Sequence, residues 1–372
     1  MKSSVSIVKC PDYEPDRVLE AVRRSLDLLG GVSNFIPPRS KVLVKPNLLM
    51  ATGPESGVDT HPEVVRAAIK ILKENNCSIL VGDSPSVWND QIEIVQDVYR
   101  LSGIAGVCRE EGVELVEFDR SSWRGKFPIT AYLDECDYLV SLPKFKTHLL
   151  TTLTAAIKNN FGLVSGTYKA ELHRLNINPK DFSKVLVDVF QEARPVLSIV
   201  DGIIAMEGDG PGTGGKLCQK GLIVAGADAV AVDSVLAKML GLEPLDILTT
   251  RIASERKLGT ADLSNIKILG EKLEEVSIKP LRLPKNLALL KMPRFLLAIL
   301  KKFIHLYPYI VDKICTRCLT CVKICPQKTI QSHNGRINIH YDNCISCFCC
   351  QESCPAAAIK VKKSLLAKII GL

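Results

Sequence analysis

The chain has 372 residues, of which 47% are hydrophobic; it is long enough for two or three domains, and its composition excludes global disorder. Its net charge of +8 is unevenly spread, because residues 285–372 hold 14 basic and three acidic side chains, which leaves −3 for residues 1–284. No aromatic stacking motif or DNA-reading module accompanies the basic part, so we expect no nucleic-acid partner. We find no signal peptide and no run of about 18 apolar residues, and we therefore expect a cytoplasmic protein.

Residues 1–284 alternate apolar, β-branched runs with helical patterns. Periodic stretches such as 63–74 and 229–240 separate the runs. Strands that alternate with helices predict an α/β domain with a mostly parallel sheet and helices on both faces. The five predicted strands lie at 41–45, 78–82, 137–142, 197–201 and 221–225.

Polar groups follow four of these predicted strands. An asparagine, an aspartate, a lysine-rich segment and a glycine-rich stretch each come directly after or shortly after one strand. Ligands of open parallel sheets bind beyond the carboxyl ends of the strands, so we expect these groups to share one pocket. Solvated loops are the alternative, since loops are polar by default. The candidate substrate-binding residues are Lys45, Asn47, Lys144, Thr147, Lys158, Asn159, Gly208 and Gly210, and the candidate catalytic residues are His148, Lys146, Glu207 and Asp83.

The lysine-rich segment SLPKFKTHLLTTLTAAIKNNFG carries the densest chemistry. Lys144, Lys146 and His148 precede a predicted helical stretch that contains three threonines. Exposed amides at a helix start, together with nearby lysines, form an anion site. A histidine at this place is also suited to proton transfer. The alternative is a solvated basic loop followed by a helix stop at 160–162.

Two further motifs are set aside. Gly210-x4-Gly215-Lys216 nearly copies a phosphate-binding loop, but Leu217 replaces the required Ser or Thr and the next residues are predicted to form a strand. Thr60 precedes His61-Pro62-Glu63 with capping-box spacing, so we expect Thr60 to cap a helix. His61 stays open, because a helix entrance beside the pocket can also face substrate.

Nine of the 14 cysteines lie between residues 315 and 354, in two runs of the form C-x2-C-x2-C-x3-C-P. In two-cluster ferredoxins the fourth cysteine of each run ligates the opposite [4Fe–4S] cluster. Structural zinc sites usually pair two short hooks per metal, and disulfide scaffolds are typical of short secreted chains, so both alternatives fit poorly. Cys349 falls outside the spacing. We expect two [4Fe–4S] clusters in a small α+β ferredoxin-like domain at 309–360, with short strands at 336–340 and 357–361; one set of ligands is Cys315, Cys318, Cys321 and Cys354, and the other is Cys344, Cys347, Cys350 and Cys325.

Two basic, amphipathic segments flank this predicted domain. Residues 285–308 place their basic side chains on about a third of a helical wheel, and we expect a linker helix that ends at Pro308. Residues 361–372 repeat the pattern as a tail. The linker is predicted either to be buried between the domains or to lie on anionic lipid or a partner.

Three stretches resemble the domain of unknown function 362 family: KPNLL at 45–49, LPKFKTH with the downstream IKNNFG, and DGIIAMEGDGPGTGG at 201–215. The resemblance covers roughly residues 40–240 and implies a prokaryotic, often archaeal protein that often carries a ferredoxin-like C-terminus. It implies no particular reaction. The positions that match recurring family positions are Lys45, Asn47, Asp83, Lys144, Lys146, His148, Lys158, Asn159, Glu207 and Gly208.

Together these features favour an oxidoreductase that passes single electrons through its clusters to a small anionic ligand. In this hypothesis Lys144 and Lys146 bind the anion, His148 donates a proton, and Asp83 or Glu207 positions groups or binds metal. The basic C-terminal part suits an acidic, soluble electron donor or acceptor, or an anionic membrane face. The rival hypotheses are a non-catalytic electron-transfer or cofactor-assembly partner and a membrane-associated redox subunit.

Overall fold

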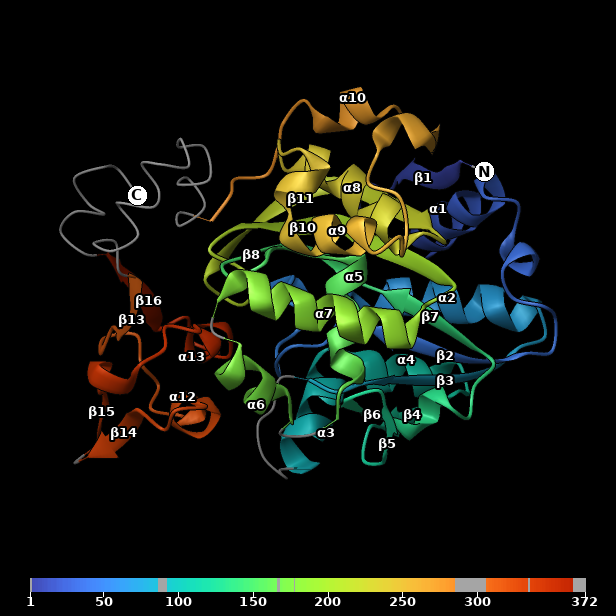
Figure 1. Cartoon of the computed structure of the whole chain (residues 1–372). Helices are drawn as coiled ribbons and strands as arrows, with labels where there is room; N and C mark the ends of the chain where they lie inside the picture. Colours follow the sequence, from blue (N-terminus) through green and yellow to red (C-terminus); the bar gives the residue numbers. More distant parts are fainter. Residues whose placement is uncertain are drawn as a thin grey trace.

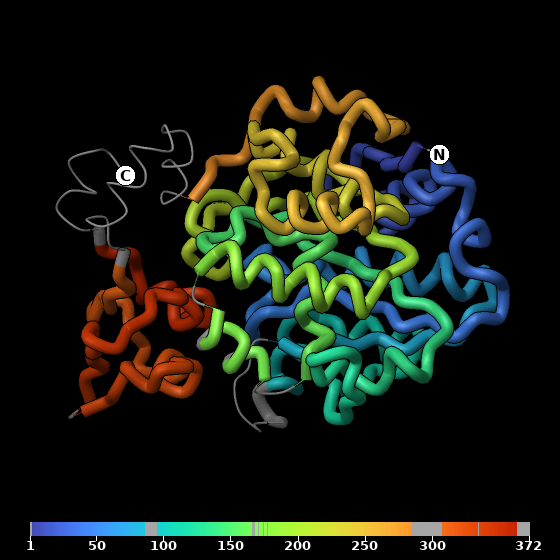
Figure 2. Tube along the Cα trace, viewed as in Figure 1, coloured from blue at the N-terminus to red at the C-terminus, as the bar shows by residue number. Residues whose placement is uncertain are grey.

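The computed structural model describes residues 2–85, 92–165, 168–176, 178–284, 306–333 and 335–363. A large α/β domain and a smaller C-terminal module lie side by side (Figure 1). Figure 2 shows the same arrangement along the chain, with the red C-terminal module against the large domain. Among the described residues, no helix combines the length and the apolar character needed to cross a bilayer.

The core of the large domain is a sheet in the order β12-β1-β11-β10-β7-β2-β3-β4. The strands from β10 to β4 run parallel, and β11 is antiparallel to both of its neighbours. The prediction of a mostly parallel sheet is therefore confirmed. The strands are β1 (Ser3–Lys9), β2 (Lys41–Pro46), β3 (Ser78–Asp83), β4 (Glu114–Glu117), β7 (Tyr138–Leu142), β10 (Leu197–Gly208), β11 (Gly215–Gly226) and β12 (Ile266–Gly270), with a separate hairpin of β5 (Ser121–Arg124) and β6 (Phe127–Thr130).

Helices cover both faces of this sheet. Successive residues of its central strands point to opposite faces and are therefore buried against different helices. Val42 and Val44 pack in one apolar core with α1 and α2, whereas Leu43 packs in another with α7. The helices are α1 (Pro15–Leu28), α2 (Pro62–Glu74), α3 (Ile92–Leu101), α4 (Ile104–Glu110), α5 (Ala156–Asn159), α6 (Tyr168–Leu175), α7 (Pro179–Ala193), α8 (Ala229–Met239), α9 (Leu248–Glu255) and α10 (Leu273–Ser277).

Helix α2 begins one residue later than its sequence suggests. The cap is His61, whose Nδ1 accepts a hydrogen bond from the Glu63 amide at 3.2 Å. Thr60, the predicted cap, is used elsewhere: its hydroxyl accepts from the Asn47 amide at 2.9 Å and donates to the Leu142 carbonyl at 2.6 Å. Thr60 thus ties β2 to the end of β7, and the cap prediction was wrong.

The lysine-rich segment folds as a hairpin rather than a helix. Strand β8 (Lys144–His148) pairs antiparallel with β9 (Thr152–Thr154) and parallel with β10, and α5 begins only at Ala156. The β-branched threonines 152 and 154 lie in β9, and Thr152 has a positive φ of 71°, so the backbone does not continue into a helix at this point. The predicted helical stretch from residue 151 was therefore wrong by about one turn.

The C-terminal module is a pseudo-twofold repeat of strand, helix and strand. Each element of its second half begins 29 or 30 positions after its counterpart in the first half. Residues 306–308, predicted as the end of the linker helix, lie in β13 because this strand pairs with β16; residues 285–305 and 364–372 lie outside the described residues. The elements are β13 (Leu306–Ile310), α12 (Thr320–Ile324), β14 (Ile330–His333), β15 (Arg336–Ile339), α13 (Cys349–Glu352) and β16 (Ile359–Lys363).

Candidate functional site: a lysine pocket beside a paired cysteine module

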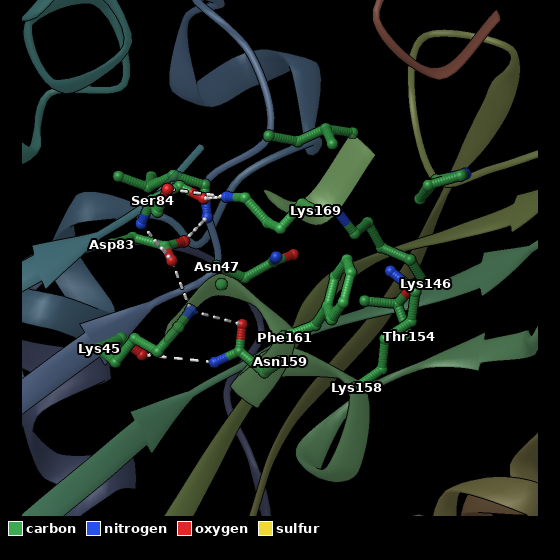
Figure 3. Close-up of a pocket in the computed structure, with 14 residues that line it drawn as sticks. Lys45, Asn47, Asp83, Ser84, Lys146, Thr154, Lys158, Asn159, Phe161 and Lys169 are labelled. Carbon is green, nitrogen blue, oxygen red and sulfur yellow. Dashed lines mark hydrogen bonds and ion pairs between the residues drawn. The ribbon is translucent and has the colours of Figure 1, made fainter. Parts of the chain in front are cut away.

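A polar pocket opens at the carboxyl ends of β2 and β3, beside the β8–β9 hairpin (Figure 3). It encloses about 430 Å³, including its open mouth. Six of the predicted residues line it. They end or follow three of the four predicted strands, so the ends of these three strands meet at the pocket. The fourth strand end contributes Pro211 of the glycine-rich loop. The lining consists of Lys45, Asn47, Leu48, Leu49, Asp83, Ser84, Lys146, Thr154, Lys158, Asn159, Phe161, Gly162, Lys169 and Pro211.

An ion pair between Lys45 and Asp83 forms the floor of the pocket. The ammonium and the carboxylate lie 2.7 Å apart, and their side chains are 0% and 1% exposed. Lys45 also donates to the carbonyl of Pro46 at 2.9 Å and to Asn159 Oδ1 at 3.3 Å. Burial lowers the pKa of Lys45, and the carboxylate of Asp83 opposes that shift. Because both charges have fixed partners, this pair sets the shape of the pocket.

Three further lysines line the pocket and have no ion-pair partner among the described residues. Lys146 donates to the Val58 carbonyl at 2.6 Å, and Lys169 donates to the carbonyl and hydroxyl of Ser84 at 2.5 and 2.7 Å. The Lys158 ammonium has no hydrogen-bond partner in the described part of the chain. Neutral acceptors satisfy part of the hydrogen bonding of Lys146 and Lys169, and none of the three ammonium groups forms a direct ion pair within the described residues.

Burial dominates the electrostatics of these lysines. It lowers the pKa of Lys169 to about 7 and also lowers the pKa of Lys158. The pKa of Lys146 is likewise lowered by burial, and the nearby carboxylate of Asp59 opposes that shift. A dissolved anion that entered the pocket would stabilise the ammonium forms, so the pocket favours a negatively charged ligand.

Two buried polar atoms at the pocket lack a partner within the described structure. They are Asn47 Oδ1 and Thr154 Oγ1. Figure 3 shows Lys146 and Thr154 across the pocket from Asp83 and Ser84, with Asn47 between them. Unsatisfied buried polar groups cost free energy unless a ligand or water completes them. These two atoms are therefore suited to bind a polar ligand.

The start of α5 is closed to an anion. The buried carboxylate of Asp233 accepts hydrogen bonds from the amides of Ala156 and Ile157 at 2.7 and 3.2 Å. This carboxylate occupies the place that an anionic ligand was predicted to take. The lysine side chains, rather than the helix amides, are what the pocket offers to an anion.

Several predicted residues lie outside the lining. Lys144 pairs with Asp201 at 2.8 Å and donates to the Tyr13 hydroxyl at 2.7 Å, so it is fully used within the core. Glu207 accepts from the Arg282 amide at 2.9 Å, near the surface. Thr147 donates to the carbonyl of Gly208 at 2.9 Å, and Gly208 and Gly210 shape the same loop. The structure gives these residues positioning contacts and does not bring them to the pocket.

His148 is also absent from the lining, and it faces the C-terminal module instead. Its Nδ1 accepts from the amides of Leu150 and Thr151 at 3.0 and 3.3 Å, while its Nε2 lies 3.4 Å from Glu352 Oε1. Burial lowers the pKa of His148 well below its ordinary value, and the nearby charge of Lys158 adds to that effect. A neutral imidazole with an occupied Nδ1 is better placed to orient Glu352 than to protonate a ligand.

The glycine-rich loop between β10 and β11 receives α13. Gln351 Nε2 donates to the Asp209 carbonyl at 3.1 Å, and the Thr213 hydroxyl donates to the Cys354 carbonyl at 2.7 Å. A Cβ at Gly212 would collide with the carbonyl oxygen of Glu352. Bare glycine backbone is therefore what lets the two domains approach, and the loop forms a docking contact. As predicted, it continues into a strand, β11, and not into the helix of a phosphate-binding loop.

The cysteines of the module fit the two predicted cluster sites. One cavity, of about 310 Å³ with its opening, is lined by Cys325, Cys344, Cys347 and Cys350, which is the second predicted ligand set. The pKa of the Cys321 thiol is raised mainly by burial and further by Cys318, Cys354 and Cys315, so the first set also lies together. Among the described residues, no three or more His, Cys, Asp or Glu side chains converge on a position for a single metal ion. The thiols thus surround spaces suited to clusters.

The backbone around both sites repeats as well. Arg317 and Leu319 have positive φ angles of 58° and 62°, and Ser346 and Phe348, 29 positions later, have 50° and 61°. Such left-handed residues turn successive amides toward one point, which favours an anion such as a cluster with its thiolates. The amides of Thr329 and Ala358 donate to the sulfurs of Cys325 and Cys354 at 3.3 and 3.2 Å. The two halves of the module are built alike around their sulfurs.

Sequence reasoning missed three residues of this region: Lys169, Thr154 and Glu352. Lys169 lies in α6, far from any strand end, and no local pattern marks it as a ligand residue. Glu352 stands between two ligand cysteines and reaches the large domain only through docking. Burial raises the pKa of Glu352 to about 7, while Lys158 and Lys146 oppose that shift. The module holds two further acids, Asp312 and Asp342, so its composition does not single out Glu352.

Comparisons with known proteins agree with this division. Residues 42–238 match the model of the domain of unknown function DUF362, and residues 307–355 match a 4Fe-4S dicluster domain. A thylakoid-associated protein of Synechocystis is 33% identical over 267 residues, which are 70% of this chain and 80% of that protein.

Shorter matches concern the C-terminal module alone. Pyruvate synthase subunit PorD of Methanocaldococcus jannaschii is 38% identical over 53 residues, and Ferredoxin-1 of Caulobacter vibrioides is 39% identical over 54; each match covers 14% of this chain, and 62% and 48% of those proteins. Among solved structures, a Thermotoga maritima protein (12% identity) and the lactate racemase apoprotein of Thermoanaerobacterium thermosaccharolyticum (13% identity) each give a TM-score of 0.38. These structures match 60% and 61% of this chain and 57% and 54% of their own lengths. By the matches of its sequence, the chain belongs to the DUF362 family and carries a ferredoxin-like [4Fe–4S] domain for electron transfer.

Proposed function

We propose that this protein is an oxidoreductase that delivers single electrons, through two [4Fe–4S] clusters, to a small anionic substrate in the lysine pocket. One observation carries the proposal: the loop that provides Pro211 to the pocket wall also provides Gly212 to the contact with Glu352. Glu352 lies between the ligand cysteines Cys350 and Cys354. The cysteine module is therefore fixed directly behind the wall of a ligand site.

The residues of the pocket divide the remaining tasks. Lys158, Lys146 and Lys169 supply positive charge to the substrate, and Asn47 and Thr154 offer it unpartnered polar atoms. The Lys45–Asp83 pair keeps β2 and β3 together beneath it. Lys146, whose pKa burial lowers, is the lining group best suited to hold or release a proton at Nζ. When bound, the clusters supply one-electron chemistry.

The proposal is tested by asking what the pocket retains during purification. Small molecules released from anaerobically purified protein would be identified by mass spectrometry, for the wild type, for Lys158→Met and for Lys180→Met. Lys180 is exposed on α7 and serves as the matched control. We expect an anion that the wild type and the control release and that Lys158→Met lacks.

The released anion is then added to protein whose clusters were reduced with dithionite. Bleached cluster absorbance should recover in the wild type and in the control, and at least about tenfold more slowly in Lys158→Met, since one lost charge–anion contact is worth about 1.5–3 kcal/mol. Recovery at equal rates in all three proteins, or no recovery in any, would contradict the proposal. Uptake of electrons without conversion of any metabolite would favour the rival role as an electron-transfer or cofactor-assembly partner.

A second observation concerns location. The Synechocystis relative is named thylakoid-associated, and the basic segment 285–305 and the basic tail 361–372 are of the kind that attract anionic lipid. We propose a cytoplasmic protein with peripheral membrane contact. It should co-sediment with vesicles that contain anionic phospholipid at low salt and be released at high salt, and equal sedimentation with neutral vesicles would argue against that contact.

A further inference from the structure

The two cysteine loops of the module are equivalent by symmetry but are not equally exposed. Leu319 in the loop 315–320 is 38% exposed, whereas its counterpart Phe348 in the loop 344–349 is 6% exposed. Among the ligands, Cys318 is exposed and its counterpart Cys347 is half-buried. The loop 344–349 is therefore less exposed to solvent than its symmetric counterpart, the loop 315–320.

The large domain accounts for this difference. The segment that follows the loop 344–349 is the one that meets the glycine-rich loop, through Gln351 and Glu352. In electrostatic terms Glu352 lies close to Cys347, and Cys349 lies close to Lys158. The second ligand set thus faces the lysine pocket. The loop 315–320 has no equivalent contact within the described part of the chain.

The face around the loop 315–320 combines basic and apolar groups. Lys313 and Arg317 are exposed, and Gly335 brings the exposed Arg336 close, since an added Cβ there would lie 3.8 Å from Arg317 Nη1. Ile314, which precedes the ligand Cys315, is 44% exposed, and Leu319 follows the exposed ligand Cys318. Asp312 is the one exposed acid in the segment 311–320. A positive rim around a small apolar centre fits a partner with acidic groups around its own redox centre.

We propose that this face, defined by Lys313, Ile314, Arg317, Cys318, Leu319 and Arg336, is the docking site of a small acidic one-electron carrier protein. A reduced carrier binds over the first ligand set, transfers one electron to the chain and then leaves in its oxidised form. The second set, at the domain contact, then serves the pocket. The direction of electron flow in this inference rests on the proposed function, but the docking itself involves no residue of the pocket.

The test measures binding rather than turnover. An acidic flavodoxin and an acidic plant-type [2Fe–2S] ferredoxin, both oxidised, would be titrated calorimetrically into the iron-loaded full chain at low and at physiological salt. The variant is Arg317→Glu with Lys313→Glu. The matched control is Arg24→Glu with Lys267→Glu, because both residues are exposed on the large domain and make no ion pair among the described residues.

We expect both wild type and control to bind at least one carrier, and binding to weaken as salt rises. The double variant should bind at least about tenfold more weakly and with a smaller salt dependence, because two attractive charges become repulsive. Iron content, measured on every protein, must stay equal, which separates lost docking from lost clusters. Equal affinity of variant and wild type, equal weakening in the control, or no binding of either carrier by the wild type would overturn the proposal. Failure of the substrate test leaves this result intact, so the two proposals fail separately.

Discussion

At the scale of single residues, the central feature is a group of buried lysines with too few carboxylates. Lys45 has Asp83 at 2.7 Å, but Lys158 and Lys169 have no ion-pair partner within the described residues. A protein normally neutralises buried ammonium groups or pairs them, because an unpaired buried charge is costly. The presence of such groups at the end of a sheet is why we propose that an anionic ligand binds there.

This arrangement predicts how sulfate binding depends on pH. Sulfate keeps its charge between pH 6 and 8, whereas burial lowers the pKa of Lys169 to about 7. The charged fraction of Lys169 in the free protein falls from about 0.9 to about 0.1 over that range, so affinity for sulfate should drop about tenfold as pH rises. Equilibrium titration at each pH measures it. Lys169→Met should bind more weakly at pH 6 and with a shallower pH dependence, and an unchanged profile in this variant would contradict the assignment.

The ion pair of the floor predicts a stability effect. Asp83→Ala leaves the Lys45 ammonium buried without its carboxylate and also removes the acceptor of the Leu48 amide at 2.7 Å. We expect a loss of about 3–5 kcal/mol in the free energy of unfolding. Urea denaturation followed by circular dichroism measures it. Asp97→Ala, which breaks an exposed pair with Arg100, is the control and should cost less than about 1 kcal/mol.

At the scale of elements, the glycine-rich loop determines how the two domains meet. Its glycines are not a phosphate cradle; at Gly212 a side chain would occupy the position of α13 backbone, which cannot move aside as a flexible side chain can. Gly214 differs, because a Cβ there would meet the end of the Gln351 side chain. The two glycines should therefore tolerate substitution unequally.

Gly212→Ala should separate the unfolding of the two domains. Differential scanning calorimetry of the iron-loaded chain is expected to show one cooperative transition for the wild type and two for Gly212→Ala. Gly106→Ala, on α4 with open space around its Cα, should keep one transition and gain up to about 1 kcal/mol of stability. A single, unshifted transition in Gly212→Ala would show that the loop is not a rigid docking contact.

Sequence patterns could predict elements whose signal is local. The strands at 41–45 and 78–82 and the short strand at 336–340 are present almost as predicted, because β-branched runs and ligand spacing are properties of neighbouring residues. The β8–β9 hairpin was missed because short alternating runs with threonine read equally well as helix or strand. The place of Lys169 in the pocket and of Glu352 at the domain contact depends on packing between distant segments, and the sequence alone contains no pattern for either.

At the scale of the whole molecule, the two cysteine runs of the module cross. Cys325 of the first run lines the cavity of the second, and Cys354 of the second run lies with the first. Each predicted cluster would therefore draw its ligands from both runs. Loss of the fourth cysteine of a run, Cys325 or Cys354, should damage the site that the other run forms.

Cys325→Ser tests the crossing. The variant should lose the site formed by Cys344, Cys347 and Cys350 and keep about four of about eight irons per chain. Electron paramagnetic resonance of the reduced protein should lose the splitting that arises between two neighbouring paramagnetic clusters. Retention of all iron, or loss of the site formed by Cys315, Cys318 and Cys321 instead, would refute the crossed arrangement.

The first and last described strands of the module pair with each other, with Leu306 opposite Lys363. The basic segment 285–305, which precedes β13, and the basic tail 361–372, which begins within β16, are therefore tethered at neighbouring points although more than fifty residues separate them in sequence. Two weak anchors held this close act at high effective concentration, so their joint grip on one charged surface should far exceed the grip of either. Truncation of the last nine residues alone would then release most of the protein from such a surface, even with the longer segment intact.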